Sequence, residues 1–589
     1  MRIKENRRAW TAGIVLSTAL WLFLFAFAKI RFAANDDQFL LRTFSWPLGA
    51  PTFHLYIHAM YAFPLSWLSR LAPSVPWVTV LEIALMWLST ATIAKSIIQC
   101  NRRSFARGLF FAVCFTALFV VYISARLTYT TVAAMLSAAC AAQLLSVDCK
   151  NATDKEIIKG MAYSLLLLVL CYGLRQMTAL PALFFCGLSF AYRFLTCFLS
   201  LEAVKRPQNR DSQGAKPLER DPGAAPLAAG GRPLRPMLVT LTAVAVAMGG
   251  LAAAREVEIT ARGQRDYLAW QQARISVLDY INLECLPAEA RETAGWTDAQ
   301  VTLLDNWYTM EESISTETFR YVADTQDNAQ TRTSPGAAIL DFRTRSPLIA
   351  LSLVVLFGIG LMCVLGLALK RKGLWTFVAL MVTAVGCLAL LAYLALQGRL
   401  PYRAVMVPVL PAAAVVFCLM PECLPDRKWF VPLLCAVTLA GTAVYAVPTW
   451  QDIRYVPPKW DYDTHEAMDK VAKENPDLLF IYSNELVNDL RIWPDMEGGL
   501  PTNLMFWGGW QRGSIEYRSK VEAFGLDSDH FTPADWLRPE LRFLSLKEEP
   551  HPVLVEHLRE QLGESLTWEQ EKMDIALYAY RFYLNEVEE

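Results

Sequence analysis

Long apolar runs alternate with polar segments along the chain. Eleven of these runs are about 20 residues long, the length that an α-helix needs to cross the hydrocarbon core of a bilayer. They cover residues 9–31, 76–98, 104–124, 127–147, 157–175, 177–199, 236–254, 346–369, 374–397, 402–421 and 429–449. The first run lacks an evident cleavage site and is expected to remain as a helix. The pattern predicts a polytopic α-helical membrane protein with about eleven transmembrane helices.

A further apolar run, from Phe53 to Leu71, decides how the chain is oriented across the membrane. It is interrupted by Pro64 and carries apolar side chains at helical spacing, which favours a helix lying in the membrane interface. If this segment does not cross, the strongly basic short loops all fall on the side of the N-terminus. The positive-inside rule then predicts a multi-pass protein of the plasma or inner membrane, with a cytoplasmic N-terminus and an extracytoplasmic C-terminus.

This topology divides the chain into four parts. Residues 1–199 form a front bundle with an outer loop at 32–75, and residues 236–449 form a rear bundle with an outer loop at 255–345. The segment 200–235 is rich in Pro, Gly, Ala and charge, and is predicted to be a flexible cytoplasmic linker. Residues 450–589 alternate strand-like and helical patterns, which predicts an extracytoplasmic α/β domain.

Several elements are expected within the outer parts. Strands are predicted at Leu478–Tyr482, Leu541–Leu546 and Ala576–Phe582, and helices at Thr464–Lys473 and Pro552–Leu562. The loop at 255–345 is expected to be mostly helical and polar. Its large aromatic side chains are expected to rest at the membrane interface, and these are Trp270, Trp296, Trp307 and Tyr308.

The composition supports insertion into a membrane and argues against some classes of partner and ligand. The 589 residues are 54% hydrophobic and 19% charged, which is too apolar for a soluble multidomain enzyme. The formal net charge of -1, with basic residues scattered over short loops, argues against a nucleic-acid partner. Nearly all of the 13 cysteines lie in or beside apolar runs without metal-ligand spacing, so neither a disulfide framework nor a zinc site is expected.

Asp36 and Asp37 follow the first apolar run directly and are the leading candidates for chemistry. They are expected close to the outer membrane surface. Adjacent ionised carboxylates repel, so at least one should have a perturbed pKa or a cationic partner. The alternative is a solvated loop, or an acidic cap on the helix that follows.

Four arginines are predicted at the outer ends of spans: Arg126, Arg175, Arg399 and Arg403. Cations are normally depleted on this face, so together they indicate binding of an anionic phosphate or pyrophosphate. The alternative is that each arginine snorkels and anchors a helix end.

Other polar groups lie near the same surface. Glu82 lies near the outer end of the second span, where it could line a lipid-headgroup site, pair with an outer arginine, or reach up to water. His54 and His58 are four residues apart, but without a carboxylate ligand at fixed spacing they indicate interface packing more than a metal site. Phe506-Trp507-Gly508-Gly509-Trp510 could stack on a sugar, although core and turn roles are favoured for such a cluster.

These features together resemble the GT-C superfamily of polytopic glycosyltransferases. The resemblance covers about residues 9–449, mainly as topology. It departs from the family in the long linker, in the 255–345 loop and in the absence of a Trp-Trp-Asp sequence, which disfavours protein N-glycosylation. The matching features are Asn35-Asp36-Asp37-Gln38, the interfacial helix, Arg175, and Gly398-Arg399-Leu400-Pro401-Tyr402-Arg403 leading into Val407-Pro408-Val409-Leu410-Pro411.

The resemblance implies inverting transfer of a hexosyl or pentosyl group from a polyprenyl-phosphate-linked donor to an envelope glycan, lipid or protein acceptor on the outer face. Asp36 or Asp37 would be the general base, and some family members bind Mg²⁺ or Mn²⁺ at this acidic site. The groups expected around the donor phosphate are Arg126, Arg175, Arg399, Tyr402, Arg403 and Glu82.

Two other functions stay open at this stage. One is a transporter or flippase for lipid-linked glycan precursors, although the charges gather at one surface and not at the midplane. The other is a non-catalytic scaffold for envelope assembly.

Overall fold

The computed structural model describes most of the chain. The described residues are 2–45, 53–101, 103–148, 153–205, 234–325, 333–370, 373–455, 464–486, 491–494, 496–497 and 499–585. Residues 206–233, the larger part of the predicted linker, therefore lie outside the description. The two ends of that predicted linker are helical and belong to the helices on either side of it.

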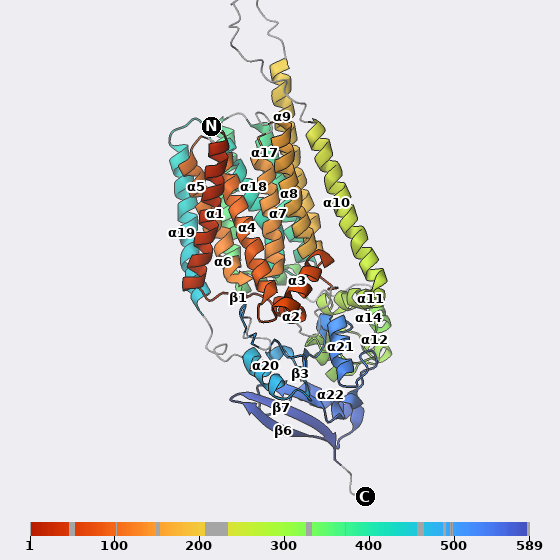
Figure 1. The fold of residues 1–589 in the computed structure, drawn as a ribbon. Helices are drawn as coiled ribbons and strands as arrows, with labels where there is room; N and C mark the ends of the chain where they lie inside the picture. Colours follow the sequence, from red (N-terminus) through yellow and green to blue (C-terminus); the bar gives the residue numbers. More distant parts are fainter. Residues whose placement is uncertain are drawn as a thin grey trace, which may run out of the picture.

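Eleven helices of the described residues are long and apolar enough to cross a membrane, which confirms the predicted count. The third is continued through a π-helical turn at Thr116–Val120 into α6 (Val121–Ala125). The chain is therefore a polytopic, multi-pass membrane protein, with its helices side by side in one bundle (Figure 1). The eleven are α1 (Arg2–Phe27), α4 (Trp77–Cys100), α5 (Phe105–Phe115), α7 (Tyr129–Ser146), α8 (Asp154–Leu174), α9 (Ala179–Lys205), α10 (Leu234–Ala261), α16 (Pro347–Lys370), α17 (Leu374–Leu396), α18 (Tyr402–Leu419) and α19 (Phe430–Arg454).

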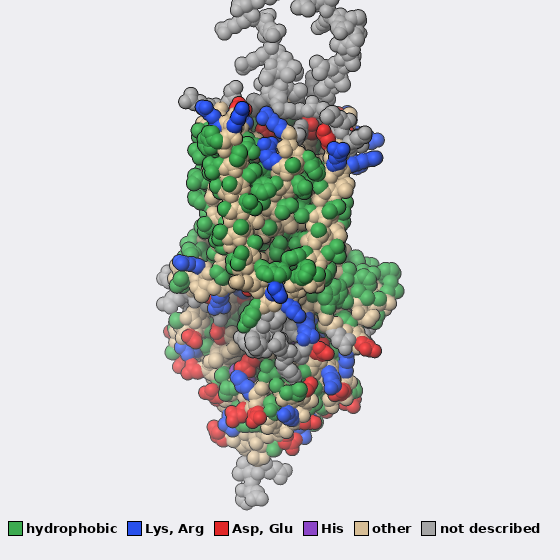
Figure 2. Space-filling model, turned by 90° about the vertical axis from the view of Figure 1, so that its left-hand side faces the viewer, with side chains coloured by type: hydrophobic (Ala, Val, Ile, Leu, Met, Phe, Trp, Pro, Cys, Tyr) green, Lys and Arg blue, Asp and Glu red, His purple; other side chains and the backbone are tan. Residues whose placement is uncertain are grey.

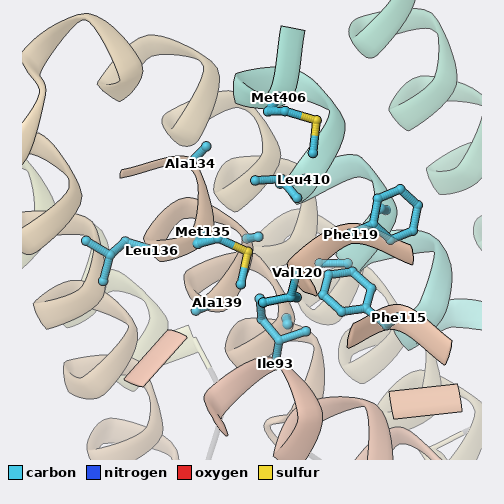
Figure 3. Packing of buried hydrophobic residues seen from close by; sticks show 14 of the residues in the cluster. Ile93, Phe115, Phe119, Val120, Ala134, Met135, Leu136, Ala139, Met406 and Leu410 are labelled. Atoms are coloured by element: carbon cyan, nitrogen blue, oxygen red, sulfur yellow. The ribbon is translucent and has the colours of Figure 1, made fainter. Parts of the chain in front are cut away.

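Two central helices join the spans that precede the linker to those that follow it. Every residue of α7 is buried, and α18 packs along it. The many alanines of α7 let neighbouring helices approach closely, as is typical of membrane bundles. Figure 3 shows Met135 of α7 among Met406 and Leu410 of α18 and the ring of Phe119. The spans on both sides of the linker therefore share one hydrophobic core.

The face of the bundle shown in Figure 2 is mostly apolar between its two ends. Figure 2 shows hydrophobic side chains forming a belt, with Lys and Arg side chains gathered at the end that carries the N-terminus. Below the belt, acidic and basic side chains are mixed. This distribution is what a protein in contact with lipid tails requires along its spans.

The segments 265–325 and 464–585 fold together at one end of the bundle (Figure 1). We call this unit the polar body. Its two segments share one hydrophobic core, which contains Trp270 and Tyr308 from the first segment and Phe480 and Phe543 from the second. Its helices are α11 (Arg265–Arg274), α12 (Ala288–Ala294), α13 (Asp298–Asp305), α14 (Thr316–Thr325), α20 (Thr464–Glu474), α21 (Ile515–Ala523) and α22 (Pro552–Leu562).

This shared core corrects one expectation. Trp270, Trp296 and Tyr308 were expected at the membrane interface, but they are buried inside the polar body at 8%, 4% and 0% exposure. Tyr308 contacts Trp507 and His557, which lie far later in the chain, while Trp270 and Trp296 both pack on Phe319 of their own segment. Hydropathy along the chain indicates neither kind of contact. The helical character predicted for 255–345 is confirmed, and it includes α15 (Pro335–Arg345) before α16.

A five-stranded mixed sheet lies within the polar body, in the order β4-β3-β5-β7-β6. β3 is parallel to β4 and β5, whereas β7 is antiparallel to β5 and β6. The three predicted strands and two predicted helices of this region are present, whereas β4, β6 and α21 were not predicted. The strands are β3 (Leu479–Tyr482), β4 (Leu504–Phe506), β5 (Leu541–Ser545), β6 (Leu566–Asp574) and β7 (Leu577–Leu584).

Two short helices follow α1 and connect the bundle to the polar body. The helix predicted from Phe53 begins only at Ala59, as α3 (Ala59–Leu71). Phe63, Trp67 and Leu71 recur every four residues on its exposed side, as expected for an interfacial helix. The other helix, α2 (Asn35–Phe44), follows a short parallel pair of β1 (Arg31–Phe32) with β2 (Arg126–Leu127).

Candidate functional site

The acidic pair occupies the first turn of α2. The capping position before it is Ala34, whose side chain cannot accept a hydrogen bond. Both carboxylates lie in the first turn, where the helix dipole favours negative charge. Phe39, further along the helix, packs on Phe506 and Trp510 of the polar body. The two aspartates are therefore held at the junction of the bundle and the polar body.

Asp36 is paired with cations. Its Oδ2 lies 2.6 Å from Nη1 of Arg403, and its Oδ1 accepts a hydrogen bond of 3.3 Å from the indole Nε1 of Trp510. Burial alone would raise the pKa of this carboxyl, but the charges of Arg403 and Arg175 outweigh it and hold the pKa below its usual value. The side chain is 16% exposed, so Asp36 is an ionised carboxylate that a ligand can reach.

Asp37 has a different environment. It is completely buried, and its Oδ1 accepts a hydrogen bond of 2.8 Å from the backbone N–H of Tyr129, the first residue of α7. Its Oδ2 has no hydrogen-bond partner among the described residues. Burial, reinforced by the charge of Asp36, raises the pKa of Asp37 to about 7. The alternative role as a helix cap therefore applies to Asp37, but the helix it caps is α7.

Two of the four predicted arginines converge on Asp36. Arg403 lies in the first turn of α18, and Arg175 follows the last residue of α8. The guanidinium of Arg175 donates to the hydroxyls of Tyr129 and Thr130, the latter at 2.8 Å, and lies 4.9 Å from the centre of the Tyr129 ring. These partners are uncharged hydroxyls, and the charge of Arg175 acts on Asp36.

The other two arginines pair elsewhere. Arg126 contacts Asp452 at 2.9 Å, and Arg399 contacts Asp279 at 2.6 Å. Tyr402 lies next to Arg403 in sequence, and its hydroxyl donates to the backbone carbonyl oxygen of Arg126 at 3.2 Å. These three residues therefore have partners of their own, and among the described residues none of them forms an ion pair or hydrogen bond with the acidic pair.

Glu82 lies in α4 behind Asp37. It is 1% exposed, so the alternative of a side chain that reaches water is wrong. Its two carboxyl oxygens have no hydrogen-bond partner among the described residues, and no ion pair with an arginine is found there. The charge of Asp37 acts on Glu82, so the two carboxyls are neighbours.

The two histidines have packing and capping roles. Nδ1 of His58 accepts from the backbone N–H of Met60 and caps α3. His54 packs edge-on against Trp510, with ring centres 5.1 Å apart. Burial and the nearby charge of Arg255 lower the pKa of His54 to about 3, so its ring is neutral at physiological pH.

The acidic pair does not fit a divalent metal. Asp36 already pairs with Arg403, and Oδ1 of Asp37 accepts a backbone N–H. Across the described part of the chain, no group of three or more His, Cys, Asp or Glu side chains is arranged to hold a metal ion. Mg²⁺ is commonly bound through one or two carboxylates with waters and substrate phosphates as its other ligands, but here an arginine holds one carboxylate and a backbone N–H holds the other, so no step is assigned to a cation.

The Trp-Gly cluster of the polar body reaches the site. Gly508 and Gly509 both have positive φ, at +135° and +63°, and a Cβ on Gly508 would lie 2.4 Å from Oγ1 of Thr309. Because of this turn, the Trp507 side chain lies in the core of the polar body, and the indole N–H of Trp510 points to Asp36. Trp507 thus has the expected core role, while Trp510 was not predicted as part of the site.

Sequence reasoning also missed the hydroxyl and aromatic groups around Arg175. Tyr56 and the adjacent pair Tyr129 and Thr130 come from distant parts of the chain, and no local pattern indicates that they meet around Arg175. A signal was present at the start of the fourth span, where Thr128 to Thr131 form a polar stretch directly after Arg126.

Comparison with known proteins adds no assignment. No family model and no curated protein matches the chain.

Proposed function

We propose that the chain is a membrane glycosyltransferase that moves a sugar from a polyprenyl-phosphate-linked donor to a hydroxyl of an envelope glycan, lipid or protein. The observation that carries the proposal is the convergence of Arg175 and Arg403 on the ionised, reachable carboxylate of Asp36. This combination offers a proton acceptor and an anion site within one cluster. Both are required for transfer from a phosphate leaving group.

The chemistry follows from this arrangement. Asp36 accepts the proton of the acceptor hydroxyl. At the same time the hydroxyl oxygen bonds to the anomeric carbon of the sugar, from the face opposite the phosphate. The bond between the sugar and the phosphate oxygen breaks, the electron pair leaves with that oxygen, and the configuration inverts. The attacking hydroxyl becomes acidic as it bonds, so a carboxylate of low pKa is basic enough.

The local charge favours a phosphate. Two guanidiniums face one firmly ionised carboxylate, while Asp37, with a pKa of about 7, is only partly ionised near neutrality. Among the described residues Glu82 has no hydrogen-bond or ion-pair partner, and an isolated carboxylate is costly in apolar surroundings, so we count it as neutral. The cluster then carries an excess of positive charge, which Arg175 and Arg403 offer to the leaving phosphate.

The same proposal includes the orientation. Lys and Arg side chains gather at the end of the apolar belt that carries the N-terminus (Figure 2), which supports a cytoplasmic location for that end. The site and the polar body are then extracytoplasmic, together with the predicted C-terminal α/β domain. Asp36 lies at the outer membrane surface, where the phosphate of a lipid-linked donor would lie.

A flippase is the weaker alternative. It would need charged groups deep in the bilayer along a substrate path. The charged groups brought together here lie at one end of the bundle, at the ends of α8 and α18 and in α2.

The proposal is tested with full-length protein in lipid nanodiscs. Wild type is incubated with polyprenyl-phosphate-linked sugars and hydroxyl acceptors, and product is followed by mass spectrometry. Asp36→Asn should lower transfer by about 10²- to 10⁴-fold, the usual contribution of a general base. The matched control is Asp298→Asn, because Asp298 is a surface residue with a side chain 89% exposed. Full activity of Asp36→Asn, or no transfer by wild type from any such donor, would refute the proposal.

A further inference from the structure

Among the described residues of the polar body, Trp510 is the one whose side chain donates a hydrogen bond to the acidic pair. It lies in a single turn at Gly509–Gln511 and is 7% exposed. Its indole N–H points to Oδ1 of Asp36, the oxygen that Arg403 does not contact in the ion pair. Buried indole N–H groups normally have a hydrogen-bond partner, and here that partner is a carboxylate.

The backbone of Trp510 is fixed from a second direction. Its carbonyl oxygen accepts hydrogen bonds from the hydroxyl of Tyr267 at 2.7 Å and from Nε2 of Gln271 at 2.5 Å, both on α11. Gln271 is in turn held by Arg274, whose Nε donates to Oε1 at 3.0 Å. The first segment of the polar body therefore fixes the backbone of this residue, which belongs to the second segment.

The ring of Trp510 is fixed from a third direction by aromatic edges. His54, Tyr56 and Phe39 surround it, with ring centres at 5.1, 5.4 and 6.0 Å. These residues come from the segment before α3 and from α2. A side chain with so many contacts has one orientation, and that orientation aims its N–H at Asp36.

We propose that Trp510 is a positioning residue for Asp36, through which the polar body completes a site whose other groups come from the membrane helices. The proposal rests on the assignment of Asp36 as the base. The Trp510 N–H stabilises the ionised carboxylate and fixes the direction of the oxygen that receives the proton. Asp36 is then competent only when the polar body is seated on α2.

Trp507 provides a matched control. It lies three residues earlier and is fully buried, and its Nε1 donates to the backbone carbonyl oxygen of Asn306 at 3.1 Å. Its ring stacks on Phe543 within the polar body. Trp507→Phe and Trp510→Phe therefore remove the same kind of group from the same unit, but only Trp510 touches Asp36.

The test reads the protonation of Asp36 directly and needs no sugar transfer. A hydrophobic carbodiimide reacts with protonated carboxyls, and peptide mass spectrometry assigns the label to Asp36 in full-length protein in nanodiscs. The labelling rate is measured from pH 3 to 6. The charged and titratable groups that face Asp36 are the same in all variants: Asp37 on α2, Arg403 on α18, Arg175 after α8, Tyr129 on α7, and His54 and Tyr56 before α3.

Loss of the Trp510 hydrogen bond should displace the labelling curve of Asp36 to higher pH. We expect about a three- to tenfold faster reaction at pH 5 in Trp510→Phe, the size of one hydrogen bond to a carboxylate. Wider access would scale the rate at every pH without moving the curve along the pH axis. An unmoved curve for Trp510→Phe, or an equal displacement for Trp507→Phe, would overturn the proposal.

Kinetics supply a second readout that separates this inference from the proposed function. Trp510→Phe should lower kcat roughly fivefold or more with an unchanged KM for the donor, because the donor phosphate is bound by the arginines. In an Asp36→Asn background the same substitution should have no further effect. If Trp510→Phe lowered kcat equally in the wild-type and Asp36→Asn backgrounds, Trp510 would have a structural role only. If Asp36→Asn kept its activity, the assignment of Asp36 as the general base would be refuted, and the labelling experiment would decide the inference about Trp510.

Discussion

Asp36 and Asp37 are adjacent in sequence but have opposite environments. Asp36 faces Arg403 and Trp510, while Asp37 is buried against the start of α7. The pKa of the first is lowered and that of the second is raised to about 7. Such a divergence separates the roles of two carboxylates: Asp36 is the proton acceptor of the proposed function, and Asp37 accepts the first backbone N–H of α7.

The raised pKa of Asp37 predicts a pH dependence of stability. Folding favours the protonated carboxyl, so its contribution is fully present below pH 3.8 and is lost as the pH rises to about 7. The two pKa values set an upper bound of about 4 kcal/mol on this loss. Asn at this position keeps the oxygen that accepts the Tyr129 N–H but does not titrate.

Thermal unfolding in nanodiscs at pH 5 and pH 8 checks this. Asp37→Asn should gain stability over wild type at pH 8 relative to pH 5, while Asp298→Asn should follow wild type at both. Parallel behaviour of wild type and Asp37→Asn would contradict the assignment.

Arg175 should bind the donor phosphate. Its hydrogen bonds go to two hydroxyls, so Arg175→Gln removes a charge from the anion site without separating an ion pair. We expect the Kd for a polyprenyl phosphate to rise at least tenfold, as loss of a charge-assisted hydrogen bond implies. Arg399→Gln is the comparison, because Arg399 pairs with Asp279. Equal effects of the two variants would contradict this placement of the phosphate.

The residues of the site differ in how well the sequence indicated them. Asp36, Arg175 and Arg403 were predictable because charge next to long apolar runs is unusual and costly. Trp510 was not, because it lies 474 positions away from Asp36. No local pattern carries information about a contact at that separation.

At the level of elements, α2 is the adaptor between the bundle and the polar body. Arg42 at its C-terminal end forms a buried ion pair of 2.7 Å with Asp469 of α20, and Thr43 donates to Glu516 of α21. Both contacts lie within two turns of the acidic pair. The seating of the polar body is therefore transmitted to Asp36 through a short, rigid helix.

Arg42→Met should weaken this seating. Removal of one partner from a buried pair typically costs about 3–5 kcal/mol, because the other charge stays in a low-dielectric environment. A lower unfolding temperature and faster proteolysis of the polar body would report it. Arg345→Met is the matched control, since the Arg345–Asp341 pair is on the surface and should change stability by less than about 0.5 kcal/mol. Similar unfolding temperatures for both variants would argue against α2 as the adaptor.

The elements themselves were predictable to different degrees. The eleven spans were found because a 20-residue apolar run has few alternatives in a membrane. β4 has three residues, too few for a period, and β6 carries a polar sequence that only pairing with β7 makes a strand. α3 began six residues later than predicted, after a loop that holds His54 beside Trp510.

At the level of the whole molecule, the proposed orientation can be tested with a native cysteine. Cys285 of the polar body is the one exposed cysteine among the described residues. In a Cys149→Ser background, a membrane-impermeant maleimide should label Cys285 in right-side-out vesicles, and Cys285→Ser should abolish the signal. Labelling confined to inverted vesicles would place the polar body in the cytoplasm.

The shape of the molecule could be predicted only in part. The charge of the loops and the length of the apolar runs were sufficient to predict the number of membrane spans. The polar body was not foreseen as one unit, because its core is made by two segments separated in sequence by α16 to α19. The hydropathy of a segment depends on that segment alone and does not show which segments pack against each other.

The central claim is that Asp36 removes the proton of the acceptor during sugar transfer. Single-turnover transfer from a donor already bound to the protein isolates this step from binding and product release. For Asp36→Asn, we expect a single-turnover rate about 10²- to 10⁴-fold below wild type, with donor affinity within about twofold. An Asp36→Asn rate equal to that of Asp298→Asn would contradict it.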